Sequence, residues 1–254
     1  MFFGYAFLYI PIAILVAFSF NDSQMVTVWA GFTTKWYQAL IQNDLILNAA
    51  WISLKIATMA ATASTMFGTL AAMMIVRFKH FSGRSIFSGL ITAPMVVPDV
   101  ILGLALLLLF VSMEQLIGWP SKRGAMTVAV AHITVSIAYV VIIIRERLVS
   151  LDNSVIEAAL DLGAKPLTVF FKITLPNIFP SIVAGWLLSF TLSLDDLVLA
   201  SFTSGAGATT LPMVVFSMIR VGVTPEINAL ATIIVAIVTI GVIISGIIIN
   251  KRQA

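Results

Sequence analysis

Three carboxylates interrupt apolar stretches of this 254-residue chain, and their positions bear directly on chemistry. Asp195 and Asp196 lie in "LSFTLSLDDLVL", and Asp99 lies in "APMVVPDVILGL". Because a charge in apolar surroundings is costly, an ionisable residue there predicts a pathway for a charged solute. Negative side chains favour a cation, so the binding of a cation in transit is the first chemistry to consider.

A polar stripe runs through the segment that ends in the two aspartates. Its members are Ser181, Gly185, Ser189, Ser193 and Asp196. Steps of three and four residues place them along one face of a helix, and Asp195 is turned about 100° away. We predict that Asp196, with Ser189 and Ser193, faces a wet pathway directly and that Asp195 contributes through its local field or an interhelix contact, although such a stripe also suits a neighbouring helix. The alternative for both carboxylates is a solvated position in the outer headgroup region, without a role in transport.

Asp99 follows two prolines that interrupt a helix. Pro94 and Pro98 each remove a backbone donor, and carbonyl groups freed at membrane depth are tolerated only where protein or water satisfies them. A broken helix with a carboxylate predicts a cation site. Asp99 could equally cap the second half of a kinked helix, and the two roles are compatible.

Other polar and aromatic side chains have more ordinary interpretations. Lys55 lies early in an apolar segment and can extend toward the membrane surface. His132 is a lone imidazole, which favours a hydrogen bond between helices over proton carriage. Trp36 and Tyr37 lie in "VTVWAGFTTKWYQAL" and are typical of interfacial anchors. Alternatively, these two rings contact an organic amine through cation–π interactions.

The composition predicts an all-α integral membrane protein that positions these residues. The chain is 60% hydrophobic and only 10% charged, whereas a soluble domain carries about 25% charged residues. Apolar residues come in blocks of about 20, the length of a membrane-spanning helix. We predict six spans at residues 1–20, 48–76, 86–112, 126–144, 178–199 and 229–249. In the second span, close helix packing is predicted by Ala57, Ala61, Ser64, Gly68 and Ala72.

Several classes of chemistry have no support in the sequence. The chain has no cysteine, no G-x-x-x-x-G-K-[ST] phosphate loop, and no group of His, Asp and Glu with metal-ligand spacing. A Ser/His/Asp constellation is not apparent either. We therefore expect no catalytic residue, no metal site and no cofactor bound by this chain, and no nucleic-acid partner.

Lysine and arginine are distributed unevenly over the predicted loops. The richer set of loops contains Arg77, Lys79, Arg84, Arg145, Arg147, Lys165, Lys172, Lys251 and Arg252. The poorer set, within residues 21–47, 113–125 and 200–228, contains Lys35, Lys122, Arg123 and Arg220. The positive-inside rule places the richer set and both termini in the cytoplasm. Residues 145–177 are then a cytoplasmic loop.

That loop contains "EAALDLGAKPLTVFFKITLP", a segment with the signals of two short helices. Capping-box spacing predicts a helix start near Ser154, and Gly163 predicts its left-handed C-terminal cap. Pro166 suits the first turn of a second helix, and Pro176 predicts the end of that helix before the next span. The segment is either a connector at the membrane surface or a helix that docks into a groove of a cytosolic partner.

The spacing within this segment resembles the EAA loop of ABC importer permeases. The matching residues are Glu157, Ala158, Ala159, Gly163, Ile173, Leu175 and Pro176. The loop also has the family's position, before the penultimate span. The resemblance implies a type I importer permease fold with a single permease domain over residues 1–254. It also implies that residues 145–177 form coupling helices in a cleft of a separate ATP-binding subunit.

Further segments resemble the putrescine/spermidine class of these permeases. They are "WYQAL", "APMVVPDVILGLALLLLF", "WLLSFTLSLDDLVLASFTSGAGATTLPM" and "PEINALATI". The resemblance implies a permease subunit, not itself an enzyme, that moves polyamines into the cytoplasm across a bacterial inner membrane. The implied partners are two copies of an ATPase that uses ATP and Mg, a second and different permease, and an external polyamine-binding protein. The implied pathway is Asp99, Asp195, Asp196, Ser189, Ser193, Trp36 and Tyr37.

Two other functions stay open at this point. One is an ABC permease for another organic cation or an amino acid. The other is an ion-coupled secondary transporter, which would also place carboxylates in the membrane. That class would not need the EAA loop, and it should show two related halves, which the sequence does not.

Overall fold

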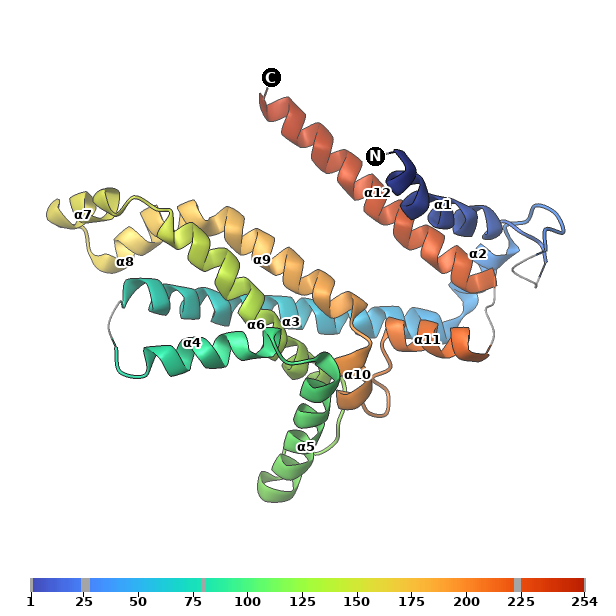
Figure 1. The fold of residues 1–254 in the computed structure, drawn as a ribbon, viewed down its shortest axis with the longest axis horizontal. Helices are drawn as coiled ribbons and strands as arrows, with labels where there is room; N and C mark the ends of the chain where they lie inside the picture. The colour runs from blue at the N-terminus through green and yellow to red at the C-terminus, as the bar shows by residue number, and fades with distance from the viewer. Residues whose placement is uncertain (1, 24–27, 79–80, 222–224, 254) are drawn as a thin grey trace. The chain divides into compact units, whose positions relative to one another are not determined.

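The computed structural model describes residues 2–23, 28–78, 81–221 and 225–253 of the chain (Figure 1). Within these ranges the regular elements are helices, and the one β-type pairing is an isolated bridge between Asn21 and Phe32. The predicted all-α class is therefore confirmed. The chain forms two compact units, one of residues 49–213 and the other of residues 1–48 with 214–254.

The larger unit contains most of the helices. They are the greater part of α3 (Asp44–Arg77), α4 (Arg84–Thr92), a 3-10 turn (Ala93–Met95), α5 (Asp99–Ile117), α6 (Ala125–Val149), α7 (Asn153–Asp161), α8 (Pro166–Val169), a π-helical segment (Phe170–Thr174), α9 (Leu175–Asp195) and α10 (Val198–Thr203). The smaller unit contains α1 (Phe2–Phe18), α2 (Lys35–Gln42), most of α11 (Leu211–Val221), and α12 (Pro225–Gln253).

Four helices of the described chain are long and apolar enough to cross a membrane. They cover Asp44–Arg77, Asp99–Ile117, Ala125–Val149 and Pro166–Asp195. The described apolar parts of α1 and α12, Gly4–Phe18 and Pro225–Ile237, are shorter. The helix lengths agree with the membrane class that composition predicts, and the number of six spans stays a prediction.

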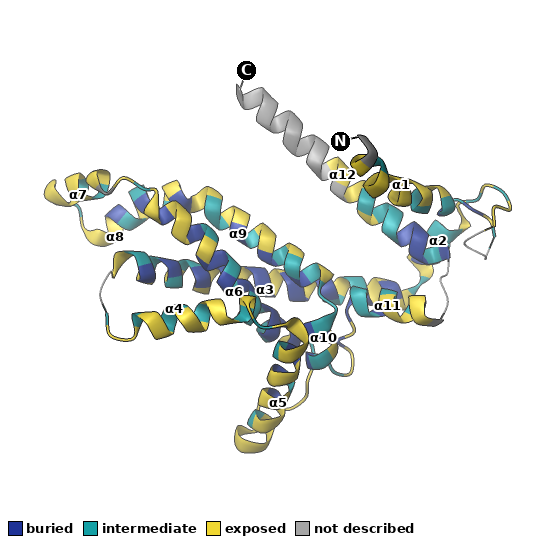
Figure 2. Ribbon diagram, in the orientation of Figure 1, coloured by how far each residue is buried: buried dark blue, intermediate teal, exposed yellow. Residues whose placement is uncertain are grey.

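Small residues on α3 allow α6 to approach closely. The buried positions are Ala57, Ala61, Ser64, Gly68 and Ala72. A Cβ added to Gly68 would lie 2.6 Å from Cγ1 of Val140 on α6, and one added to Gly185 on α9 would lie 3.5 Å from the same atom. The predicted close packing is confirmed. Figure 2 shows buried residues along α3, α6 and α10, whereas α4 and α5 are largely exposed.

The predicted third span, residues 86–112, is not one continuous helix. α4 ends at Thr92, the 3-10 turn with Pro94 follows, and α5 begins directly after Pro98. α5 leaves this turn in a direction different from that of α4 (Figure 1). The predicted break is confirmed, because neither proline can donate to the helical hydrogen-bond ladder.

The predicted fifth span, residues 178–199, has different ends in the structure. Helical backbone runs unbroken from α8 through the π-helical segment into α9, and it stops at Asp195. Pro176 does not end a helix as expected, but lies in the first turn of α9. The N–H of Leu175 bonds to the carbonyl of Phe170, five residues back. This wider turn shifts the carbonyl groups out of the usual register, so the proline ring and its missing donor are accommodated.

Candidate functional site

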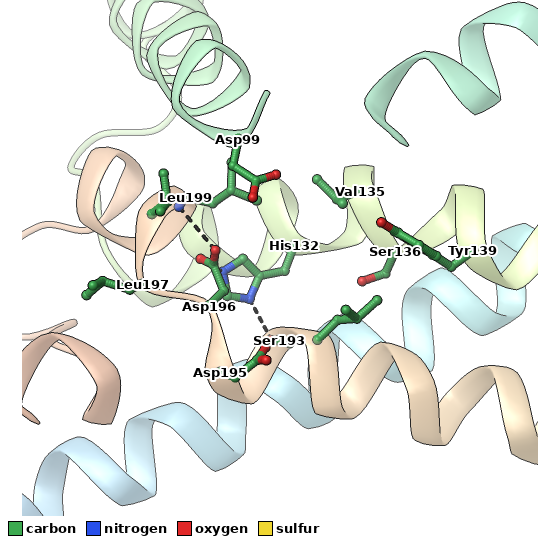
Figure 3. A pocket seen from close by; sticks show the side chains of 12 residues that line it. Asp99, His132, Val135, Ser136, Tyr139, Ser193, Asp195, Asp196, Leu197 and Leu199 are labelled. Carbon is green, nitrogen blue, oxygen red and sulfur yellow. Dashed lines mark hydrogen bonds and ion pairs between the residues drawn. The ribbon is translucent and has the colours of Figure 1, made fainter. Parts of the chain in front are cut away.

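A cavity of about 340 Å³ opens where α5, α6, α9 and α10 of the larger unit meet (Figure 3). Its polar wall is formed by Asp99, His132, Ser136, Tyr139, Ser193, Asp195 and Asp196. The structure therefore brings all three predicted carboxylates to one cavity. Of the other polar wall residues, the sequence analysis placed Ser193 on the pathway and found no pathway signal for Ser136 or Tyr139.

Asp99 reaches the cavity because α5 begins there. It is the first residue of α5, directly after Pro98, and it is exposed. A carboxylate in the first turn is favoured by the helix dipole, but this helix has no side-chain cap bond. The expected capping role is thus limited to a charge–dipole interaction, and the carboxylate is available to the cavity.

Asp196 lies in a setting different from the one that helix periodicity predicts. α9 ends at Asp195, and Asp196 has extended backbone with φ −69° and ψ 124°. Its carboxylate accepts hydrogen bonds from the N–H groups of Leu199 at 3.3 Å and Ala200 at 2.9 Å, in the first turn of α10 (Figure 3). The prediction that Asp196 continues the helical stripe of Ser193 is wrong, because the helix has already ended.

His132 joins Ser193 and Asp196 across helices. Its Nδ1 lies 2.6 Å from Oγ of Ser193, and its Nε2 lies 3.0 Å from Oδ2 of Asp196. The imidazole is almost completely buried, with 2% of the side chain exposed. This geometry agrees with the expected role of His132 as a hydrogen bonder between helices.

The same contacts bring a serine, a histidine and an aspartate together, which the sequence analysis did not find. The three-residue spacing of Ser193 and Asp196 was the available signal, but nothing in the sequence connects it to His132. Ser193 is 5% exposed, and the carboxylate is engaged by the first turn of α10. A nucleophile must reach its substrate, so this group is suited to holding helices together.

Ser189 and Asp195 differ in their access to the cavity. Ser189 is fully buried and lies outside the cavity wall. Asp195, the last residue of α9, is exposed and lines the wall. Within the described ranges, neither Asp195 nor Asp99 forms an ion pair, and no three acidic or histidine side chains converge as metal ligands. Asp99 and Asp195 are therefore the carboxylates that a solute in the cavity can reach.

Trp36 and Tyr37 lie in the smaller unit, at the start of α2. The indole Nε1 donates to the carbonyl of Asn21 at 2.7 Å, and the Tyr37 hydroxyl lies 2.6 Å from Oγ of Ser19. Nζ of Lys35 lies over the indole ring, 4.7 Å from its centre. The polar tips of both residues are thus occupied within the unit. An amine contact at these rings stays a prediction.

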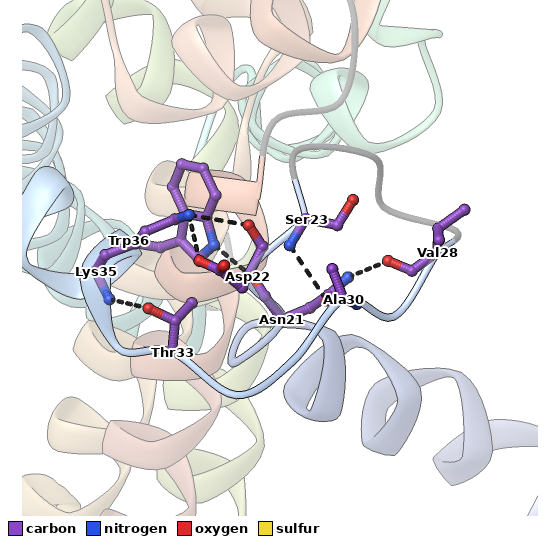
Figure 4. Close-up of polar contacts among 8 residues, drawn as sticks. All are labelled: Asn21, Asp22, Ser23, Val28, Ala30, Thr33, Lys35 and Trp36. Carbon is purple, nitrogen blue, oxygen red and sulfur yellow. Dashed lines mark hydrogen bonds and ion pairs between the residues drawn. The ribbon is translucent and has the colours of Figure 1, made fainter.

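Asn21 bonds to Val28 and Ala30 beside Trp36 (Figure 4). Its side-chain amide donates to the carbonyl of Val28 at 2.7 Å, and its Oδ1 accepts from the N–H of Ala30 at 2.9 Å. Lys35 and Asp22 form an ion pair beside it. Trp36 thus donates to a residue that is itself bonded to Val28 and Ala30, which favours the structural interpretation of Trp36.

The first helix of the cytoplasmic segment begins near Ser154, as predicted, but with a different capping residue. α7 starts at Asn153, and its N-cap is Asp152. The Asp152 carboxylate accepts from the backbone N–H of Ser154 at 2.9 Å, and this bond lowers the pKa of the carboxyl. An aspartate suits this position because its negative charge also complements the helix dipole.

Gly163 ends α7 in the predicted left-handed conformation, with φ of +83°. The N–H of Gly163 donates to the carbonyl of Leu160 at 2.9 Å, and the N–H of Ala164 donates to the carbonyl of Ala159 at 3.0 Å. These two bonds form a Schellman motif. Pro166 then occupies the first turn of α8, also as predicted.

Two arginines hold the junction between α8 and α9. Arg77, the last residue of α3, donates to Oγ1 of buried Thr174 at 3.1 Å. Nε of Arg147 on α6 donates to the carbonyl of Asn177 at 3.0 Å, and the Asn177 side chain donates to the carbonyl of Ile173 at 2.7 Å. The π-helical segment is therefore tied to both α3 and α6.

The residues that match the EAA pattern differ in exposure. Glu157, Ala158, Gly163 and Pro176 are exposed, whereas Ala159, Ile173 and Leu175 are half-buried. Beside them, Leu162 and Leu167 are 89% and 71% exposed. Large apolar side chains this exposed on adjoining turns are typical of a surface that a partner covers.

Comparison with known proteins identifies relatives over most of the chain. Residues 64–253 match the family described as "Binding-protein-dependent transport system inner membrane component". The chain is 58% identical over 237 residues to the putrescine transport system permease protein PotI of Escherichia coli K12, covering 93% of this chain and 84% of that protein. It is 43% identical over 248 residues to the spermidine/putrescine transport system permease protein PotC of the same strain, covering 98% and 91%.

Solved structures share the fold at low sequence identity. A chain of a bacterial ABC transporter involved in the import of the acidic polysaccharide alginate aligns with a TM-score of 0.68 at 16% identity, covering 98% of this chain and 92% of that one. A chain of the MetNI methionine ABC transporter aligns with a TM-score of 0.61 at 16% identity, covering 83% and 96%. These likenesses establish the fold alone.

Proposed function

The chain belongs to the family of binding-protein-dependent transport system inner membrane components, and from this premise we propose that it is a permease subunit of an ATP-driven polyamine importer. The observation that carries the proposal is the 58% identity to a putrescine permease over 93% of the chain. The 43% identity to a spermidine/putrescine permease supports the same substrate class. In this role the chain moves the solute, and a separate subunit hydrolyses ATP.

The chemistry of the cavity suits a polyamine. Such a solute carries several ammonium groups along a flexible apolar chain, and it loses hydrating water within a membrane. Asp99 and Asp195 provide separated negative charges on one wall that also contains Val135, Leu192 and the ring of Tyr139. Separated carboxylates offset the desolvation of a long polycation, and an aromatic ring attracts an ammonium group. Several weak contacts also allow release.

We assign the coupling to the ATPase to α7 and α8. The Schellman turn at Gly163 fixes the angle between them, and exposed Leu162 and Leu167 offer apolar surface for a groove. From α8, unbroken helical backbone leads to Asp195 on the cavity wall. A rigid element that begins at the ATPase contact and ends at the cavity passes a displacement from one to the other.

The proposed importer contains further subunits. They are two copies of an ATPase that uses ATP and Mg, a second and different permease, and an external polyamine-binding protein. The distribution of lysine and arginine supports a cytoplasmic position for both termini and for residues 145–177. We treat the two units as parts of one permease domain, residues 1–254, because the family match extends into both.

Uptake by the reconstituted complex tests this function. The chain is copurified with its partner permease and ATPase and placed in proteoliposomes with the binding protein. We expect radiolabelled putrescine or spermidine to accumulate only with ATP, and unlabelled polyamine to compete. Asp195→Asn in the same complex is the matched control for the cavity. Accumulation of a different organic cation or an amino acid in place of polyamines would overturn the substrate, and uptake driven by an ion gradient without ATP would overturn the importer class.

A further inference from the structure

We propose that His132 is a positioning residue for transport, which acts by holding Asp196 and so keeps the wall of the cation cavity in shape. The inference rests on the proposed function, because it concerns the same cavity. His132 adds no charge of its own to this account, and its contribution is geometric. Three features of the larger unit carry it: the hydrogen-bond chain through the imidazole, the donors around Asp196, and the packing of α10.

The contact with Asp196 locates a proton on one nitrogen of the imidazole. A carboxylate only accepts hydrogen bonds, so the Nε2 that lies 3.0 Å from Asp196 carries the proton. In a neutral ring Nδ1 is then an acceptor, and Oγ of Ser193, 2.6 Å away, donates to it. Both ring nitrogens of this buried side chain are satisfied, so the ring has one defined orientation.

Asp196 is held by three groups on two helices. His132 reaches it from α6, while the N–H groups of Leu199 and Ala200 reach it from the first turn of α10. Its side chain is only 14% exposed. Asp196 is therefore a fixed charge that connects α6, the end of α9 and the start of α10, in contrast to exposed Asp195 beside it.

α10 is the element that this contact positions. Leu199 packs in a cluster with Leu106, Phe110 and Ala131 of α5 and α6. At the far end, Oγ1 of Thr127 on α6 donates to the carbonyl of Thr203 at 2.7 Å. Loss of the His132 contact would release the first turn of α10 while its far end stays tied. The separation of the reachable carboxylates on α5 and α9 would then no longer be fixed.

Three substitutions separate the two contacts of the ring. His132→Gln places an amide donor near the position of Nε2, so it keeps the bond to Asp196. His132→Asn places an amide near the position of Nδ1, so it keeps only the contact with Ser193. His132→Leu keeps neither. Thr134→Val is the matched control on α6, because within the described part of the chain that hydroxyl bonds only to the carbonyl of Val130 in its own helix.

The measurement is the initial rate of polyamine uptake by the reconstituted complex, corrected for the amount of assembled complex. We expect Gln to keep most of the parent rate, and Asn and Leu to lose about tenfold or more, the usual effect of deleting a hydrogen bond to a charged group. Thr134→Val should match the parent. Equal uptake by the Gln and Asn variants would overturn the inference, and so would parental uptake by all three.

A double-mutant cycle distinguishes action through Asp196 from a general loss of packing. If His132 works through Asp196, adding His132→Leu to the Asp196→Ala variant should lower the uptake rate less than twofold, whereas His132→Leu in the parent lowers it severely. Fully multiplicative losses would contradict the inference. If the His132→Leu variant does not assemble, the inference is tested by comparing uptake by the His132→Gln and His132→Asn variants. If the parent complex transports a different solute, only the polyamine assignment is refuted. The same His132 variants are then tested with that solute.

Discussion

The backbone N–H of Ala164 donates to the carbonyl of Ala159 at 3.0 Å and closes the turn between α7 and α8. The turn can close because Gly163, between them, adopts a φ of +83°. Among the described residues other than its two chain neighbours, none has a heavy atom within 4 Å of a Cβ added to Gly163. The restriction at this position is therefore conformational rather than steric, and the angle of the proposed coupling helices depends on it.

Gly163→Val is expected to uncouple ATP hydrolysis from uptake while the chain still inserts. A residue with a Cβ pays roughly 1–2 kcal/mol in the left-handed region, and a β-branched one pays more. Gly163→Asn is the matched control, because asparagine tolerates this conformation. The checks are polyamine uptake and polyamine-stimulated ATPase activity of the purified complex. Normal values for both in the valine variant would remove this turn from the coupling mechanism.

Gly68→Ala is expected to destabilise the packing of α3 against α6. The added Cβ would lie 2.6 Å from Cγ1 of Val140, and overpacking of this kind costs about 1–3 kcal/mol. Cβ of Val140 would also lie 2.8 Å away, so only Val140→Gly removes both clashing atoms, and Gly68→Ala should cost less in that background than in the parent. The measurement is the thermal unfolding midpoint of the complex in detergent. An equal cost of Gly68→Ala in both backgrounds would contradict this explanation of the interface.

Asp99→Asn and Asp195→Asn are each expected to reduce polyamine uptake without affecting assembly. Both carboxylates line the cavity and are exposed, and losing ~1.4 kcal/mol of interaction lowers affinity about tenfold. Asp196→Asn should lower both uptake and thermal stability, because it removes the charge from a carboxylate that is bonded to three groups, and hydrogen bonds to charged groups contribute about 1.5–3 kcal/mol. Uptake rates at subsaturating polyamine and unfolding midpoints separate the two effects. Parental uptake by all three variants would refute the charged pathway.

Thr174→Val is expected to weaken coupling by freeing the π-helical segment from α3. The substitution keeps the side-chain shape but deletes the acceptor of Arg77, and hydrogen bonds to charged groups contribute about 1.5–3 kcal/mol. Thr191→Val is the control, because that hydroxyl bonds only to the carbonyl of Leu187 in its own helix. The ratio of solute moved to ATP hydrolysed is the measurement. Equal ratios in both variants would argue against a role in coupling for the hydrogen bond between Arg77 and Thr174.

Trp36→Phe and Trp36→Leu are expected to behave alike, with a lower unfolding midpoint and an unchanged apparent KM for polyamine. Both delete the indole donor to the carbonyl of Asn21, and the ring already has Lys35 over it. If the ring instead binds the amine, phenylalanine should preserve uptake, and leucine should lose the ~0.5–2 kcal/mol of a cation–π contact. A higher KM in the leucine variant alone would restore Trp36 to the pathway.

Several features of the fold were predictable because their causes are local. The length and apolarity of α3, α5, α6 and α9 follow from composition over about 20 residues. The turn after α7 needs a residue that tolerates positive φ, and Gly163 supplies it. The break before α5 follows from two prolines that cannot donate to the helical ladder. The small residues of α3, such as Gly68, likewise predict close packing before the partner helix is known.

The sequence indicated which carboxylates belong to the candidate site, but not how they are arranged. Asp99, Asp195 and Asp196 stand out in the sequence as charges among apolar residues, but periodicity cannot tell where a helix stops. The segment "SLDDLVL" contains neither glycine nor proline, and its aspartates, which suit a helix cap, do not by themselves show that α9 ends at Asp195.

That end was decided by tertiary contacts. Asp196 caps the first turn of α10 and bonds to His132, which is 64 residues away along the chain. The meeting of Asp99 and Asp195 at one cavity likewise depends on how α5, α6 and α9 pack. Local composition therefore determined the helices and their turns, whereas only the packed structure decided which carboxylates are held and which are free, because the bond to His132 and the meeting of Asp99 with Asp195 join residues that no sequence window contains.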